Sequence, residues 1–174
     1  MTEKDKILKR HENRADLAGE HKLGDAGQLV LLLVFLIVWI GDSFFLHVST
    51  FAADWIPFYL RIPLALILLF GSGYFARSGL QIVFGETREL PEVIRKGVFN
   101  QVRHPIYLGS ILFYFGLCVA TLSVSSFVIM LVITAFYHFI AQYEEKLLLQ
   151  KFGAKYEKYL QEVPMWLPQF KNKR

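Results

Sequence analysis

The sequence predicts an all-α integral membrane protein with four transmembrane helices, and three observations support this. Hydrophobic residues make up 54% of the 174 residues, above the roughly 45–50% of soluble domains. They are concentrated in four blocks. The length of each block approaches the roughly 20 residues that a helix needs to cross a bilayer. The blocks are continuous, whereas the strands of a membrane barrel would alternate between lipid-facing and lumen-facing residues.

The four spans are expected at about residues 28–48, 57–84, 106–122 and 123–143. The last two are separated only by Ser123 to Ser126, which leaves room only for a tight antiparallel hairpin. The chain therefore divides into an N-terminal segment (1–27), a first helix pair (28–84) and a C-terminal unit (85–174).

The basic residues predict the orientation of the chain. Six lie in residues 1–27, four in 85–105 and seven in 144–174, whereas the links at 49–56 and 123–126 carry none. An even number of crossings places the three basic regions on one side, and the positive-inside rule makes that side cytoplasmic. We therefore expect a multi-pass protein of the cell inner membrane with both termini in the cytoplasm.

A helix with one apolar face is predicted near the C-terminus. Its apolar residues recur at steps of three or four, and Pro164 should end it. Trp166 suits a membrane interface, and the helix should lie against the bilayer or over the bundle. The apolar face consists of Leu148, Phe152, Tyr156, Tyr159 and Val163.

Two isolated features inside the apolar blocks also carry expectations. Asp42, in the outer part of the first span, is expected near the outer headgroups, with a position facing the bundle as the alternative. Gly71 and Gly73 fit a loose dinucleotide-binding fingerprint, but no strand precedes them. They are expected instead to allow close helix packing.

Polar residues at the two ends of the predicted hairpin are the strongest sign of chemistry. Arg103 and His104 stand where the third span begins, and Glu144 and Glu145 stand where the fourth ends. Because the two spans are antiparallel, all four residues should meet at one membrane face. This predicts a cytoplasmic polar pocket with an apolar floor, open to a soluble cofactor and to a lipidic substrate. Each residue alone also has an ordinary structural explanation.

Metal and disulfide chemistry is not indicated. The chain has a single cysteine, and no two of its five histidines stand three or four residues apart. A disulfide, a thiolate zinc site and a helical metal-binding pair are therefore all unsupported. No metal ligand and no nucleic-acid partner are predicted.

The motif RHPIYLG at 103–109, followed by EEKLLLQKFGAKYEKYLQEVPMWLP at 144–168, resembles the isoprenylcysteine carboxyl methyltransferase family. The resemblance covers roughly residues 85–170. Membrane phospholipid N-methyltransferases share much of the pattern, and sterol reductases share a similar Arg-His-Pro element. The resemblance implies that S-adenosylmethionine is the cofactor and that residues 85–174 form the methyltransferase core.

The family pattern also implies roles for individual residues. Glu144 would bind the cofactor through its ammonium group, and Phe99 replaces the usual tyrosine. Eukaryotic members carry an arginine a turn before the acidic pair, where this chain has Ile140 and only His138 as a nearby cation. The implied cofactor contacts are Pro91, Glu92, Val93, Ile94, Phe99, His104, Pro105, Ile106, Tyr107 and Glu144. Arg103, His104 and Glu145 are the implied catalytic residues, and Arg103 and His138 the implied substrate contacts.

The function predicted is methyl transfer to a membrane-embedded lipid or lipidated acceptor, with carboxyl O-methylation favoured. A carboxylate acceptor needs no acid or base, whereas an amine acceptor would need His104, or Glu145 through water, to take a proton. The alternatives are phospholipid amine N-methylation, an NADPH-dependent reductase, and a structural membrane protein or heme or ion carrier. The last would not need Arg-His-Pro and Glu-Glu to converge. The oligomeric state is left open.

Overall fold

The computed structural model describes residues 22–85 and 92–169, and every regular element in those ranges is helical. This confirms the all-α prediction. The long helices are α2 (Lys22–Ile40), α3 (Phe58–Phe84), α4 (Pro105–Thr121) and α5 (Val124–Phe152). The short elements are the π-helical η1 (Gly41–Leu46), the 3₁₀ turns η2 (Phe51–Asp54) and η3 (Gly97–Asn100), and α6 (Ala154–Glu162).

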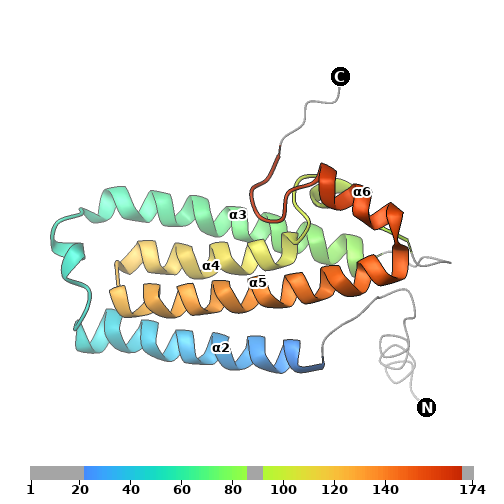
Figure 1. The fold of residues 1–174 in the computed structure, drawn as a ribbon. Helices are drawn as coiled ribbons and strands as arrows, with labels where there is room; N and C mark the ends of the chain where they lie inside the picture. Colours follow the sequence, from blue (N-terminus) through green and yellow to red (C-terminus); the bar gives the residue numbers. More distant parts are fainter. Residues whose placement is uncertain (1–21, 86–91, 170–174) are drawn as a thin grey trace, which may run out of the picture.

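The four long helices lie side by side and form an elongated bundle (Figure 1). Three segments are long and apolar enough to cross a membrane: Ala26–Leu46, Phe58–Phe84 and Val124–Phe152. The chain is therefore membrane-embedded. Helix α4 is apolar but has 17 residues, about 25 Å of helix, so a fourth crossing stays a prediction.

The hairpin between α4 and α5 is tighter than predicted. Helix α4 ends at Thr121 and α5 begins at Val124, with Leu122 in the left-handed conformation at φ 56°. The hydroxyl of Ser123 accepts a hydrogen bond from the backbone N–H of Ser126 and so caps α5. Helix α5 does not end near residue 143 but continues to Phe152.

The predicted C-terminal amphipathic helix is broken at Gly153. Gly153 adopts φ 54°, a conformation that costs other residues about 1–2 kcal/mol. Residues 148–152 therefore belong to α5, and α6 begins afresh at Ala154. The predicted apolar face is nevertheless buried, because Tyr156, Tyr159 and Val163 form one cluster with half-buried Leu148 and Phe152. Val93 packs on this cluster, so α6 covers the loop before α4.

The closest approach between helices is that of α4 to α3, and it depends on glycines of α4. A Cβ added to Gly109 would lie 2.9 Å from the backbone nitrogen of Ala76 and 2.9 Å from the backbone oxygen of Ser72. By contrast, a Cβ on Gly73 would meet nothing within 4 Å, and one on Gly71 would be 3.7 Å from Leu112. The prediction that Gly71 and Gly73 allow close packing is therefore wrong.

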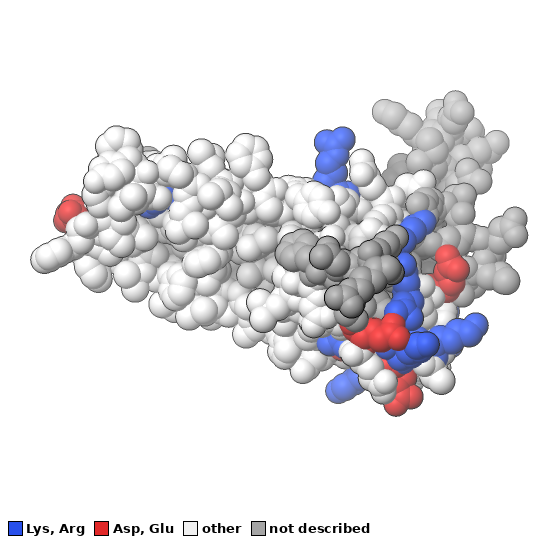
Figure 2. All heavy atoms as spheres, turned by 90° about the horizontal axis from the view of Figure 1, so that it is seen from above, with Lys and Arg blue, Asp and Glu red and all other residues white. Residues whose placement is uncertain are grey.

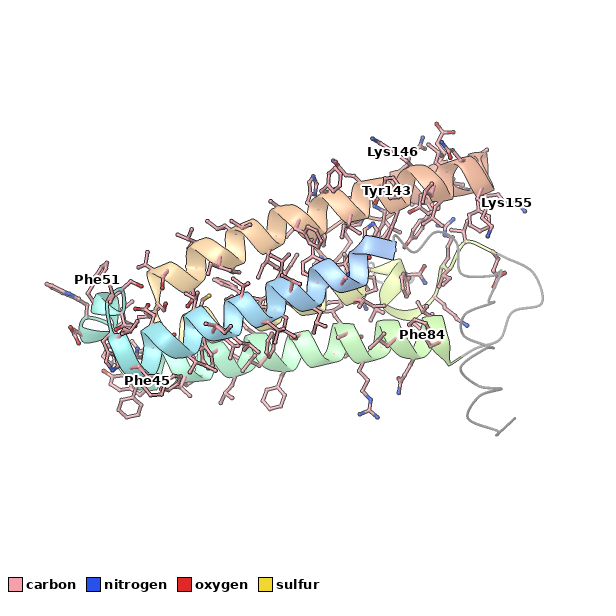
Figure 3. The ribbon with its side chains drawn as sticks, turned by 90° about the horizontal axis from the view of Figure 1, so that it is seen from below. Phe45, Phe51, Phe84, Tyr143, Lys146 and Lys155 are labelled. Carbon is pink, nitrogen blue, oxygen red and sulfur yellow. The ribbon has the colours of Figure 1, made fainter. Side chains whose placement is uncertain are left out.

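Charged residues gather at one end of the bundle. Figure 2 shows most Lys, Arg, Asp and Glu side chains at the end that carries α6, while the rest of the described surface is largely uncharged. Figure 3 places Tyr143, Lys146 and Lys155 at this end and Phe45 and Phe51 at the other. The described parts of the basic regions at 85–105 and 144–174 thus lie at one end of the bundle. That this end is cytoplasmic stays a prediction.

Asp42 connects the end of α2 to the α4–α5 turn, so it faces the bundle, which was the alternative prediction for this residue. The residue is 6% exposed. Its carboxylate accepts hydrogen bonds from the backbone N–H and the hydroxyl of Ser49, and from the hydroxyls of Ser123 and Ser125. Because these donors replace water, the buried charge is tolerated.

Asp42→Asn is expected to lower the melting temperature in detergent by several degrees. The amide nitrogen cannot accept hydrogen bonds, so either the backbone N–H of Ser49 or the serine hydroxyls lose their acceptor, at a cost of about 1–3 kcal/mol. Thermal unfolding followed by circular dichroism measures the effect. Asp54→Asn in η2 makes the same chemical change at an exposed site. Equal melting temperatures for the two variants would show that the serine contacts contribute nothing.

Candidate active site

The first turn of α4 and the following helix α5 bring the predicted polar residues together. His104 immediately precedes α4 in a non-helical conformation (φ −120°, ψ 66°), and Pro105 opens the helix. Proline is suited to this position because its missing N–H would be unsatisfied there in any case. Pro105 is fully buried, and the backbone N–H of Arg103 donates to the carbonyl of Pro164. The direction of the His104 side chain is thereby set by backbone contacts.

Glu145 is held between Arg103 and His104. Its Oε1 atom lies 3.0 Å from His104 Nε2 and 3.0 Å from Arg103 Nε. The arginine contact is an ion pair without hydrogen-bond geometry, while Arg103 Nη1 donates to the carbonyl of Leu160 at 3.1 Å. Arg103 and Glu145 are each 14% exposed. The charge of Glu145 is therefore largely committed to these two neighbours.

The hydrogen bond to Glu145 determines where His104 carries its proton. A carboxylate can only accept, so the Nε2 atom of His104 must be the donor. In the neutral imidazole the lone pair is then on Nδ1. Nδ1 lies 3.8 Å from Glu144 Oε2, so the basic nitrogen of His104 is directed to the side of Glu144.

Glu144 is positioned by Tyr107. The Tyr107 hydroxyl donates to Glu144 Oε1 at 2.5 Å. The rings of Tyr107 and His104 are almost parallel, with centroids 5.7 Å apart, and Tyr107 also contacts the ring of Tyr137 at 5.2 Å. Glu144 is 20% exposed, more than His104 at 8% or Glu145 at 14%. Of the two carboxylates, Glu144 is thus the one better placed to meet a ligand.

Comparison with known proteins identifies the family of this chain. The sequence matches the family described as phospholipid methyltransferase over residues 64–155, more than half of its length. The chain belongs to the phospholipid methyltransferase family. The matched range contains Arg103, His104, Tyr107, Glu144 and Glu145, so the clustered residues all lie in the part that defines this membership.

A relative with a named activity is the methanethiol S-methyltransferase of Crocosphaera subtropica. It is 30% identical to this phospholipid methyltransferase family member over an alignment 155 residues long, which covers 80% of this chain. The match spans 57% of the length of the relative. Together with the family match, this confirms the predicted kinship with membrane methyltransferases of the isoprenylcysteine carboxyl methyltransferase type.

Other predicted cofactor contacts in this family member lie in several parts of the fold. Ile106 faces α3, where a Cβ on Gly79 would be 2.7 Å from its Cγ1 atom. Phe99 packs against the buried cluster of Phe75, Val98 and Val102. Val93 packs on the α6 cluster, Glu92 is exposed and Ile94 half-buried. Pro91 lies outside the described residues. Cofactor contacts for all of these stay predictions.

Two tyrosines of α6, Tyr156 and Tyr159, are buried close to Glu145. Burial raises the pKa of Tyr156 and Tyr159 above the ordinary tyrosine range, and the negative charge of Glu145 adds to the rise at both. Both phenols therefore stay protonated at neutral pH. The Tyr159 hydroxyl donates to the carbonyl of Phe99 at 2.7 Å, which joins α6 to the loop before α4. Neither phenol is suited to act as a base.

Trp166, which suits a membrane interface, has neighbours that sequence reasoning did not identify. It packs against the core of the bundle, with its ring centroid 6.0 Å from that of His104 and 6.1 Å from that of His138. Its position two residues after Pro164, inside the motif of the resemblance, was the available signal. Tyr137 was also missed as a neighbour of Tyr107, since a buried aromatic residue in a span carries no sign of its role.

Proposed function

We propose that this protein transfers the methyl group of S-adenosylmethionine to a nucleophile that reaches the polar cluster from the membrane. The observation that carries the proposal is the meeting of Glu144, Tyr107 and His104 at the charged end of an apolar bundle. Family membership supports methyl transfer, and so does the name of the S-methylating relative.

The chemistry of the cluster fits this cofactor. S-adenosylmethionine carries an ammonium group, a sulfonium cation and an adenine ring. Glu144 would hold the ammonium group, because its carboxylate is partly exposed and already oriented by Tyr107. The nearby rings of Tyr107 and Trp166 offer faces that attract a cation. When bound, the cofactor would supply an electrophilic methyl group, and neither a metal nor a covalent intermediate is needed.

The residues of the chain then have separate tasks. Alignment of reactants can account for roughly 7–11 kcal/mol of a barrier, and the buried contacts around His104 provide a rigid frame for it. An acceptor that carries a proton would release it to His104 Nδ1, the nitrogen on the side of Glu144. The imidazolium so formed is stabilised by Glu145, which already accepts the proton on Nε2. Arg103 positions Glu145.

The cations near the cluster are engaged with other groups and are not placed to hold a carboxylate. This favours a thiol over the carboxylate acceptor suggested by the resemblance. Arg103 is engaged with Glu145 and with the carbonyl of Leu160. His138 accepts a hydrogen bond from Trp166 at Nδ1, which requires that nitrogen to be unprotonated. Ile140, at the position of the family arginine, is buried and apolar. We therefore propose an apolar thiol as the preferred acceptor, and a carboxylate or a phospholipid amine as the competing outcomes.

His104→Ala is expected to lower kcat for a thiol by about 10²–10⁴-fold, the usual contribution of a general base. Transfer of labelled methyl from S-adenosylmethionine by detergent-solubilised protein measures this, with hexanethiol, a prenylated cysteine and phosphatidylethanolamine as acceptors. Lys146→Gln, a charge removed at an exposed position next to the acidic pair, is the matched control.

Two outcomes would contradict the proposal. A folded wild-type protein that shows no saturable binding of S-adenosylmethionine by calorimetry would rule out methyl transfer, and binding of NADPH in its place would indicate a reductase. Methylation of the prenylated cysteine but not of hexanethiol would retain methyl transfer and return the acceptor to a carboxylate.

A further inference from the structure

A short segment of the chain returns across the start of α4. Residues 163–169, here called the strap, follow α6. The strap is attached to the loop before α4 at two points. The carbonyl of Pro164 accepts from the N–H of Arg103, and the N–H of Gln169 donates to the carbonyl of Gln101, each at 3.0 Å. Trp166 lies between these two points and contacts His104.

Trp166 is also held by a side chain of α5. Its indole Nε1 donates to His138 Nδ1 at 3.1 Å. Indole nitrogen can only donate, so this hydrogen bond exists only while His138 Nδ1 is unprotonated. The other ring nitrogen, Nε2, lies 3.1 Å from the side-chain amide of Gln142. The side chain of His138 is exposed on the surface of the bundle, six residues before Glu144 in α5.

We propose that Trp166 is a positioning residue for His104, and that its hydrogen bond to His138 is a proton-sensitive latch on the strap. When His138 gains a second proton, two N–H donors face each other and the latch is lost. Trp166 then no longer holds the ring of His104, and the indole ring of Trp166 is lost from the group of rings beside Glu144. The consequence for cofactor affinity rests on the proposed function, whereas the latch itself does not. The family match ends at residue 155, before the strap.

Protonation of other groups near the latch could produce the same pH dependence. His104, at the start of α4, contacts the same indole ring. Glu144 and Glu145 on α5 flank His104, and Arg103 is paired with Glu145. The strap itself contributes no charged residue over 163–169. A substitution that removes only the titration of His138 therefore distinguishes the latch from these groups.

His138→Gln makes that distinction, because the glutamine oxygen can accept from indole but does not titrate. Imidazole is the side chain that changes charge between about pH 5 and 8. In wild-type protein, acrylamide should quench the Trp166 emission, obtained by subtraction of the Trp166→Phe signal, more strongly at about pH 5.5 than at about pH 7.5. In His138→Gln the quenching should be the same at both values. This readout needs no cofactor.

Calorimetry at the same two pH values then tests the consequence. Wild-type affinity for S-adenosylmethionine should fall about fivefold or more at the lower pH, within the usual range of coupling between sites. His138→Gln should stay within about twofold, and Trp166→Phe should bind weakly at both, as expected when a coupling is removed. The same pH dependence in His138→Gln as in wild type would overturn the latch. The expected quenching in a protein that never binds the cofactor would support the latch and reject the proposed function.

Discussion

Gly109→Ala is expected to destabilise the protein strongly and to weaken cofactor binding as well. The added methyl would lie 2.9 Å from backbone atoms of Ala76 and Ser72, which cannot move aside as a flexible side chain can. Helices α3 and α4 must therefore separate, and overpacking of this kind costs about 1–3 kcal/mol. Because Gly109 is only two residues beyond Tyr107 in α4, the displacement also moves the contact of Tyr107 with Glu144. Thermal unfolding in detergent and calorimetry with S-adenosylmethionine measure the two effects.

Gly73→Ala is the matched control for this prediction. It makes the same change inside α3, where a Cβ meets nothing within 4 Å. Alanine is favoured over glycine in a helix by about 1 kcal/mol, so this variant should be as stable as wild type or more stable. If Gly109→Ala were as stable as Gly73→Ala, the close approach of α3 to α4 would not be required.

Glu144→Gln is expected to weaken binding of S-adenosylmethionine by about tenfold to a hundredfold. Hydrogen bonds to charged groups contribute about 1.5–3 kcal/mol, and about 1.4 kcal/mol corresponds to tenfold in affinity. Glutamine is nearly isosteric and can still accept from Tyr107, so the melting temperature should change little. Calorimetry with purified variants gives the affinity directly.

Two further variants show whether the effect is specific to Glu144. Glu157→Gln removes the same charge at an exposed position of α6 and should leave affinity unchanged. Glu145→Gln should reduce turnover more than affinity, because Glu145 is paired with Arg103 and His104. Equal affinity of Glu144→Gln and wild type would remove Glu144 from the cofactor site.

Hydropathy, charge and one short turn were enough to predict where the site lies. Continuous apolar blocks that approach the length needed to cross a bilayer are typical of helices, and a turn of only four residues forces the last two helices to be antiparallel. Arg103 and His104 before one helix and Glu144 and Glu145 late in the next must then meet at one end. The structure confirms this meeting. The prediction that these residues meet did not depend on how each helix is rotated about its axis.

Other features depended on the tertiary structure because they depend on rotation about the helix axes. A span that is apolar on every side has no polar face to indicate which residues point inward. The sequence therefore could not show that Gly109 rather than Gly71 is at the closest helix contact, or that Asp42 faces the serines of the turn. The sequence also could not predict the contact of Trp166 with His138, because that contact requires the helix to end at Gly153 and the chain to return over α4. The sequence by itself determined the membrane fold and the location of the polar cluster, and only packing decided the partner of each side chain.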